Sequence, residues 1–101
     1  MFIVRDIMHC KPGSARPMVE KFHALNKAMK KTGYSYKMRI MTDVCAERYW
    51  TVVSEMEVES LEEYTKMSRS AMADKNFQKA MKNYHDLIDG GRREIYMLEK
   101  E

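Results

Sequence analysis

The sequence predicts an α+β domain whose elements follow the order strand, helix, strand, strand, helix, strand. Three observations lead to it. Stretches near both ends and in the middle are apolar or alternate with a period of two, which is typical of strands. Two intervening stretches space their apolar residues by three and four, which is typical of amphipathic helices. Proline, glycine and serine stand at the boundaries between these stretches.

The first strand and helix are the clearest elements. Residues 2 to 9 carry apolar side chains on both alternating sets, which indicates a central strand covered on both faces. Ser14 is a candidate cap, and Pro17 fits only the first turn of a helix. We expect a helix of roughly fourteen residues, ended near Gly33. Its buried stripe is Met18, Phe22, Leu25 and Met29.

Two strands are expected next, because the period changes to two from about residue 34 to residue 44 and again from 48 to 60. A turn centred near Ala46 would join them as an antiparallel pair. The register that follows pairs Ile40 with Val52, Met38 with Ser54 and Lys37 with Glu55. One face of this pair is then apolar and the other mixed.

The second helical stretch begins at Ser60 and Glu63, which fit a capping box. Residues 69 to 74 are expected to interrupt it, and a second run starts near residue 74. That run carries the stripe Phe77, Met81, Tyr84 and Ile88. Gly90 and Gly91 are expected to end the helix, because glycine adopts a left-handed terminus without steric cost. Residues 92 to 99 then form the last strand, beside the first.

These elements predict a ferredoxin-like fold, with strand order 4-1-3-2 in an antiparallel sheet and both helices on one face. We treat residues 1–101 as one domain. The other face would expose apolar side chains, drawn from Ile3, Ile7, Met41, Val53, Ile95 and Met97. A second copy is expected to cover it. The resulting homodimer would enclose a barrel-like interior able to hold a small organic ligand.

Composition argues against several classes of protein. The net charge of +3 is small and the basic residues are scattered, so nucleic-acid binding is not expected. No apolar run approaches the about 20 residues of a membrane span, nor is there a secretion signal, so we expect a cytoplasmic protein without membrane contact. Cys10 and Cys45 are expected to be free thiols, and their spacing predicts no metal site.

Four segments carry a resemblance to a known family. They are CKPG after the first strand, MRIMTDV in the second, YWTVVSEMEVESLEEY across the third, and YHDLIDGGRREIY near the end. Together they resemble the NIPSNAP-like branch of the dimeric α/β-barrel superfamily, and the similarity covers nearly the whole chain. The resemblance implies homodimers with cavities between sheet and helices. The superfamily includes cofactor-independent monooxygenases of antibiotic biosynthesis, haem-binding and haem-degrading enzymes, lactone isomerases and proteins without an assigned activity.

The haem-degrading branch suggests catalytic candidates. The resemblance to this branch implies a site built from an asparagine on the first strand, a tryptophan on the third and a histidine on the second helix. Trp50 and His85 match the last two, whereas Arg5 and Asp6 stand where the asparagine is wanted. Core packing is favoured for Trp50 and a hydrogen-bonded structural role for His85, so no cofactor is expected and haem is the open alternative. His9, at the end of the first strand, is the third candidate.

Charges on the central strand point to a ligand site. Arg5 and Asp6 face opposite sides of the sheet, so one of them should line the interior or join an ion pair across a dimer. The candidate ligand-binding residues are Arg5, Asp6, Arg39, Glu55 and Arg93. Arg92 and Arg93 could hold a carboxylate or enolate at the cavity entrance. Alternatively, they could cap the helix end and bind Asp89.

The function predicted from these features is a homodimer that binds a small organic ligand, with no assigned catalysis. One alternative is a cofactor-independent monooxygenase acting on an aromatic or polyketide-like substrate, with Tyr36, Tyr49, Tyr64, Trp50 or His85 steering proton transfer to oxygen. The other is a non-enzymatic scaffold for protein interactions. The binder needs a pocket, the enzyme also needs a convergent base, and the scaffold needs neither.

Overall fold

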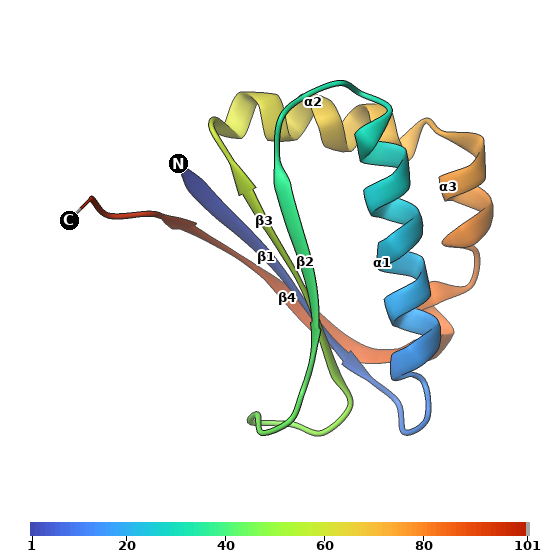
Figure 1. The fold of residues 1–101 in the computed structure, drawn as a ribbon. Coiled ribbons are helices and arrows are strands. Elements are labelled where there is room, and N and C mark those ends of the chain that lie inside the picture. The colour runs from blue at the N-terminus through green and yellow to red at the C-terminus, as the bar shows by residue number, and fades with distance from the viewer. Residues whose placement is uncertain (101) are drawn as a thin grey trace.

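The computed structural model describes residues 1–100 and has two layers, a sheet and a set of helices on one of its faces (Figure 1). The elements are β1 (Phe2–Cys10), α1 (Ala15–Lys30), β2 (Lys37–Thr42), β3 (Thr51–Val58), α2 (Leu61–Met72), α3 (Lys75–Ala80), the 3-10 helix η1 (Tyr84–Leu87) and β4 (Ile88–Met97). The four strands are antiparallel in the order β2-β3-β1-β4. This confirms the predicted ferredoxin-like topology, in which the last strand lies beside the first.

Helix α1 covers the β2 and β3 side of the sheet. The expected stripe of Met18, Phe22 and Met29 is buried, and Leu25 packs beside it. Residue His23 falls outside this stripe and is exposed, as its position one residue beyond Phe22 predicts. The helix therefore uses its apolar face for the core, and its two ends place the adjoining loops.

The register between β2 and β3 differs from the prediction by two residues. Met38 pairs with Met56, Ile40 with Ser54 and Lys37 with Glu57. The loop of residues 43–50 causes the shift. It closes where Asp43 N donates to the Thr51 carbonyl at 3.1 Å and Thr51 N donates to Asp43 Oδ1 at 2.9 Å. Because a shift of two preserves alternation, every side chain keeps its predicted face.

Helix α2 begins as predicted, since Ser60 Oγ accepts a hydrogen bond from Glu63 N at 3.1 Å. The expected interruption is confined to residues 73 and 74 and does not begin at residue 69, because α2 continues to Met72. Met67 and Ala71 are both 0% exposed and extend the buried stripe by one turn, which holds this segment helical. Only then does Asp74 cap α3, accepting from Phe77 N at 2.9 Å.

The long second run and its glycine stop are wrong. Helix α3 has six residues, and Phe77 is its buried residue. The chain then turns at Asn83, whose φ of 64° places it in the left-handed region, and β4 already begins at Ile88. Gly90 and Gly91 therefore lie within β4. A Cβ on Gly91 would lie 2.6 Å from the Ile7 carbonyl oxygen, so glycine is needed there for strand pairing and not for ending a helix.

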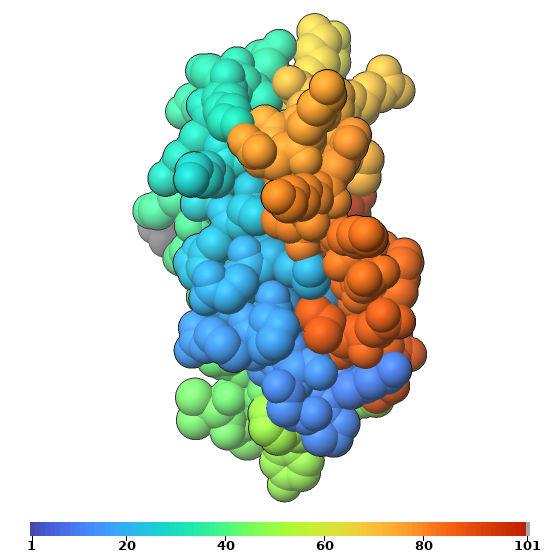
Figure 2. Space-filling model, turned by 90° about the vertical axis from the view of Figure 1, so that its right-hand side faces the viewer, coloured from blue at the N-terminus to red at the C-terminus, as the bar shows by residue number. Residues whose placement is uncertain are grey.

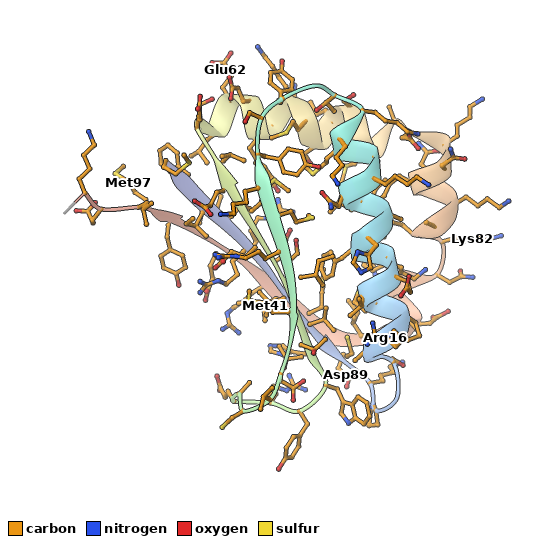
Figure 3. The ribbon with its side chains drawn as sticks, viewed as in Figure 1. Arg16, Met41, Glu62, Lys82, Asp89 and Met97 are labelled. Carbon is orange, nitrogen blue, oxygen red and sulfur yellow. The ribbon has the colours of Figure 1, made fainter. Side chains whose placement is uncertain are left out.

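The register also assigns the faces of the sheet. Ile3, Ile7, Met41 and Val53 lie on the open face, the one away from the helices, as expected. Ile95 and Met97 oppose Val4 and Phe2, so they lie on the helix side. They are nevertheless 46% and 63% exposed. The end of β4 projects past the helices and leaves them uncovered (Figures 1 and 3).

The structure also bears on the state of the two cysteines and on the predicted lack of a membrane span. Cys10 is buried and Cys45 is exposed, and both are free thiols, as predicted. Among residues 1–100, no helix has the length and apolar character needed to cross a membrane.

Candidate functional site

A pocket of about 640 Å³ lies between the sheet and the helices. We call it the helix-side pocket. Side chains from β1, β3, β4 and all three α-helices line it. Its apolar wall includes two phenylalanines, Phe22 and Phe77, and five methionines: Met8, Met29, Met56, Met72 and Met81. Thioether side chains are flexible, so this wall can adapt to the shape of an occupant.

The pocket extends past the end of α3. Helix α3 packs mainly against α1 and α2, and the chain then leaves the helical path at Asn83. Met81 and Tyr84, which follow α3, line the pocket and are only partly buried. Figure 2 shows the outer surface of this region, where α1 runs beside α3 and η1.

An ion pair forms the polar part of the pocket wall. Asp6 and Arg93 face each other across β1 and β4, and Arg93 Nε donates to Asp6 Oδ1 at 2.7 Å. The Arg93 guanidinium carbon also lies 5.7 Å from the centre of the Tyr64 ring. The hydrogen bond to Asp6 raises the pKa of Arg93, so its guanidinium is a permanent cation. Burial raises the pKa of Tyr64, so its phenol stays protonated at neutral pH and can donate a hydrogen bond.

Sequence reasoning missed some polar groups of this pocket. Ser54, Ser68 and Gln78 line it and were not singled out, and Tyr64 was considered only for the monooxygenase alternative. The signal for Ser54 was present in the alternation of β3. It is a polar residue between Val52 and Met56 on the apolar face, and it is 2% exposed. A buried hydroxyl at such a position indicates a polar function or a cavity beside it.

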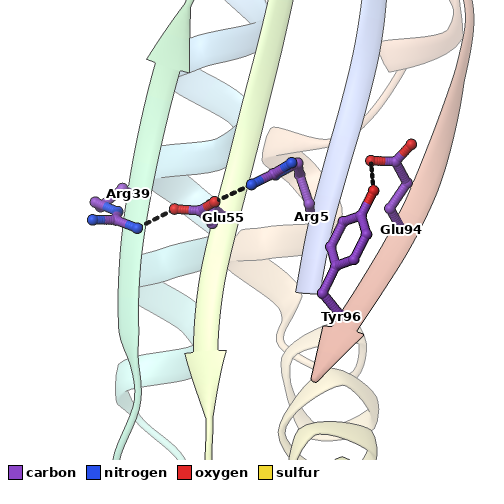
Figure 4. A network of polar contacts seen from close by, with 5 residues as sticks. All are labelled: Arg5, Arg39, Glu55, Glu94 and Tyr96. Carbon is purple, nitrogen blue, oxygen red and sulfur yellow. Dashed lines mark hydrogen bonds and ion pairs between the residues drawn. The ribbon is translucent and has the colours of Figure 1, made fainter. Parts of the chain in front are cut away.

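The open face carries the other charged candidates in one connected network (Figure 4). Glu55 on β3 accepts a hydrogen bond from Arg5 on β1 at 2.7 Å and a second from Arg39 on β2. Tyr96 on β4 continues the row, since the Arg5 guanidinium lies 5.4 Å from its ring centre and its hydroxyl donates to Glu94 at 2.9 Å. We call these residues the open-face network, and they span all four strands.

Electrostatics of the open-face network favour a structural role. Glu55 is only 7% exposed, and the hydrogen bond from Arg5, followed by that from Arg39, lowers its pKa despite burial. The hydrogen bond from Arg92 likewise lowers the pKa of Glu94. Arg5 and Asp6 each form an ion pair within the chain, with Glu55 and Arg93 respectively, and an ion pair across a dimer stays a prediction. Neighbouring strands place these partners directly opposite each other in register.

Arg92 and Arg93 separate onto the two faces. Arg92 Nε donates to Glu94 at 2.8 Å on the open face, whereas Arg93 binds Asp6 on the helix side. The alternative in which both cap a helix and bind Asp89 is wrong, because β4 begins before them and no helix ends there. Of the two, only Arg93 reaches the helix-side pocket.

His9 lines a second pocket of about 410 Å³ on the open face, together with Arg5, Glu55 and part of the loop of residues 43–50. Its Nδ1 is buried, and among residues 1–100 it has no hydrogen-bond partner. The prediction placed His9 close to a cavity mouth, and His9 does line a cavity. The cavity, however, is not the one that contains Asp6 and Arg93.

Trp50 and His85 do not come together in one site. Trp50 is 43% exposed and lines a surface pocket with Arg16 and Val19, so its expected core packing is wrong. The loop before β3 adopts a φ of 61° at Trp50, which takes the side chain out of the strand alternation. His85 is exposed on η1 and stacks on Tyr84 with ring centres 3.9 Å apart, so it is not a buried structural histidine.

These positions do not fit a haem site. A haem site of the expected kind would need Trp50 and His85 around one cavity, whereas Trp50 lines a surface pocket and His85 lies exposed on η1. Within the same residues, no group of three histidine, cysteine or acidic side chains could hold a metal ion. The five predicted ligand-binding residues thus divide between the faces, with Asp6 and Arg93 in the helix-side pocket and Arg5, Arg39 and Glu55 in the open-face network.

Comparisons with known proteins show structural likeness without sequence likeness. No protein-family model matches the chain, and no curated protein is significantly similar to it. The structure of protein Atu4242 from Agrobacterium tumefaciens superposes with a TM-score of 0.80 at 15% identity, over 99% of this chain and 95% of that one. Atu4242 is a NIPSNAP family protein with unknown function. The crystal structure of an uncharacterised NIPSNAP domain protein from Burkholderia xenovorans has a TM-score of 0.77 at 11% identity. The match covers 98% of this chain and 95% of that one.

An enzyme fold is among the similar structures as well. A crystal structure titled antibiotic biosynthesis monooxygenase gives a TM-score of 0.71 at 11% identity, over 99% of this chain and 100% of that one. The predicted resemblance to NIPSNAP-like and monooxygenase-like proteins is therefore confirmed for the fold. At these identities the likeness shows the fold alone, and one fold hosts many chemistries.

Proposed function

We propose that this protein is a homodimer that binds a small organic molecule in the helix-side pocket of each copy, with no catalysis assigned. The observation that carries the proposal is the pocket itself. Its volume of about 640 Å³ lies in the range typical of small-molecule sites, about 300–1,000 Å³. Its wall is mainly apolar, with the Asp6–Arg93 pair and the Tyr64 hydroxyl as polar groups that could orient a ligand.

The homodimer rests on apolar surface that one copy leaves uncovered. Met41 on the open face is 39% exposed and Tyr96 is 48% exposed. At the projecting end of β4, Met97 and Leu98 are 63% and 54% exposed. Adjacent apolar side chains on a projecting strand are costly in water, and a symmetric partner would bury them. The pocket lies on the helix side, so pairing of two copies through the open face, where Met41 and Tyr96 lie, would leave it accessible.

A cofactor-independent monooxygenase is the second candidate. The observation that favours it is the Tyr64 hydroxyl, which lines the pocket and stays protonated. The fold of the chain is also similar to that of a monooxygenase structure. Such an enzyme would consume oxygen with an aromatic substrate, and Tyr64→Phe would abolish turnover while leaving binding intact. The interaction-scaffold alternative requires no pocket, so the cavity favours the binder over it.

We propose that the protein is cytoplasmic. The free thiols support this, because an exposed cysteine such as Cys45 persists in a reducing compartment, where oxidation would not cross-link two copies. Fractionation of cells that express the chain would test this.

Native mass spectrometry together with a binding assay tests the main proposal. The purified protein should run at twice the chain mass. It should also bind N-phenylnaphthylamine, a neutral dye that fluoresces in apolar sites. Ser68→Phe places a ring in the helix-side pocket and should weaken dye binding by about tenfold or more.

The control for this assay is Ser70→Phe, the same substitution two residues along α2 at an exposed position outside the pocket. It should bind the dye as the unsubstituted protein does. Thermal melts of both variants show whether they fold. A folded Ser68→Phe variant that binds the dye normally, or an unsubstituted protein that does not bind it, contradicts the proposal. A chain that stays monomeric contradicts the dimer.

A further inference from the structure

The charge around the helix-side pocket is strongly one-sided. Of the residues that the structure describes, Asp6 is the one acidic side chain in its wall, and Arg93 neutralises it. Three lysines of α3 and the turn after it also line the pocket: Lys75, Lys79 and Lys82. Among residues 1–100 none of the three is in an ion pair. The pocket therefore carries three uncompensated positive charges at its rim, which raise the local concentration of anions.

A fourth cation stands beside this rim. Lys21 on α1 reaches across to the end of α3, where its ammonium group donates to the carbonyl oxygens of Ala80 and Lys82. Asp74, the residue that caps the start of α3, is already bound to Lys31 at 2.9 Å. No carboxylate is thus left to balance the rim among the groups that line the pocket.

Arg93 is held in a geometry that suits a carboxylate. Its Nε is bound to Asp6, and its guanidinium lies over the Tyr64 ring, so two contacts restrict its motion. Its two terminal amino groups have no hydrogen-bond partner within residues 1–100. A planar guanidinium with free terminal groups can bind a carboxylate through two parallel hydrogen bonds.

The rest of the wall excludes a small, fully polar anion. Phe22, Phe77 and the five methionines offer no hydrogen bonds, so a compact polyanion would leave most of the wall in contact with water. A purely apolar molecule would fill the wall but cover the Arg93 guanidinium without pairing it, which is costly. A molecule with an apolar body and a single anionic head satisfies both parts.

We infer that the helix-side pocket selects an organic monocarboxylate, with an aliphatic or aromatic body against the methionine wall and its head on Arg93 under the lysine rim. This rests on the proposed function, because it names the class of ligand for the same pocket. The Asp6–Arg93 pair is the anchor, and the lysines supply attraction at longer range.

Competition between two ligands of equal length tests the inference. Decanoate and decanol share one apolar chain and differ in the head group. Each is titrated against N-phenylnaphthylamine bound to the full-length protein, at fixed ionic strength. Decanoate should displace the dye at concentrations at least about tenfold lower than decanol, the difference expected for charge-assisted hydrogen bonds.

A paired variant tests the anchor without leaving a buried charge. Asp6→Asn with Arg93→Gln removes both charges together, so it should fold and bind the neutral dye, and it should lose most of the preference for decanoate. Arg92→Gln is the matched control, because Arg92 is the adjacent residue on the opposite face. It should keep the full preference.

The outcomes separate the two proposals. Normal dye binding with equal displacement by decanoate and decanol overturns the monocarboxylate inference and leaves the binding function standing. An undiminished preference in the paired variant overturns the role of Arg93. Failure of the unsubstituted protein to bind the dye overturns the proposed function itself.

Discussion

The two faces of the sheet use charged residues in opposite ways. On the open face, Glu55 is clamped between Arg5 and Arg39 and each charge of the row has a partner. On the helix side, Asp6 and Arg93 form one pair beside a pocket, and the lysines that line it are in no ion pair within residues 1–100. Where residues sit opposite each other in register they neutralise one another. Where a cavity separates sheet from helices, charge is left available to a ligand.

The largest effect should come from breaking the open-face network at its centre. Glu55→Gln keeps the shape of the side chain but leaves the two arginines without their anion. Because Glu55 is buried, we expect the free energy of unfolding to fall by about 2–3 kcal/mol. Urea denaturation at one protein concentration measures it, since a dimer's stability depends on concentration.

The comparison for that variant is Glu94→Gln. Glu94 belongs to the same network, but its partner Arg92 is half exposed, with 50% of its side-chain surface in contact with solvent. Its loss should change stability much less, because exposed ion pairs contribute little. Equal effects of the two substitutions would mean that burial does not distinguish the centre of the network from its edge.

A smaller effect is expected where β4 lies closest to β1. Gly91→Ala places a methyl group 2.6 Å from the Ile7 carbonyl oxygen and 3.1 Å from the Met8 sulfur, so the strands must shift. We expect a loss of about 1–2 kcal/mol, the usual range for overpacking. Gly90→Ala is the matched control, because its Cβ meets nothing within 4 Å. Thermal melts of the two variants should separate clearly, and coincident melts would contradict the close approach.

The smallest effect is the pH dependence contributed by Glu55. Its pKa is lower in the folded protein than in the unfolded chain, so its contribution to stability is fully present above the unfolded pKa of about 4.3. That contribution is lost as the pH falls through the folded pKa. The stability gap between the unsubstituted protein and Glu55→Gln should therefore be constant from pH 7 to about 5 and narrow at lower pH. If the stability gap widened on acidification, the pKa of Glu55 would be raised and not lowered in the folded protein.

The candidate site was partly within reach of the sequence. Asp6 and Arg93 were both singled out as ligand-binding residues, because a charge on a central strand needs a partner. The position of Arg93 on the helix side could not be predicted, since it depends on the alignment of β4 against β1. The predicted core packing of Trp50 was wrong for a related reason. It stands only two residues before Val52, but the loop leaves the strand geometry just before Thr51.

By itself, the sequence determined the order of the elements, the cap at Ser60, the stripe of α1 and the opposite faces of Arg5 and Asp6. These follow from periods of 2 and 3.6 and from bonds between near neighbours, which are local properties of the chain. Only the tertiary structure decided the register of β2 against β3, the length of α2, the place of Gly91 within β4 and the pocket above Asp6 and Arg93. Those depend on how a loop closes and on contacts between residues far apart in the chain, and no local pattern records them.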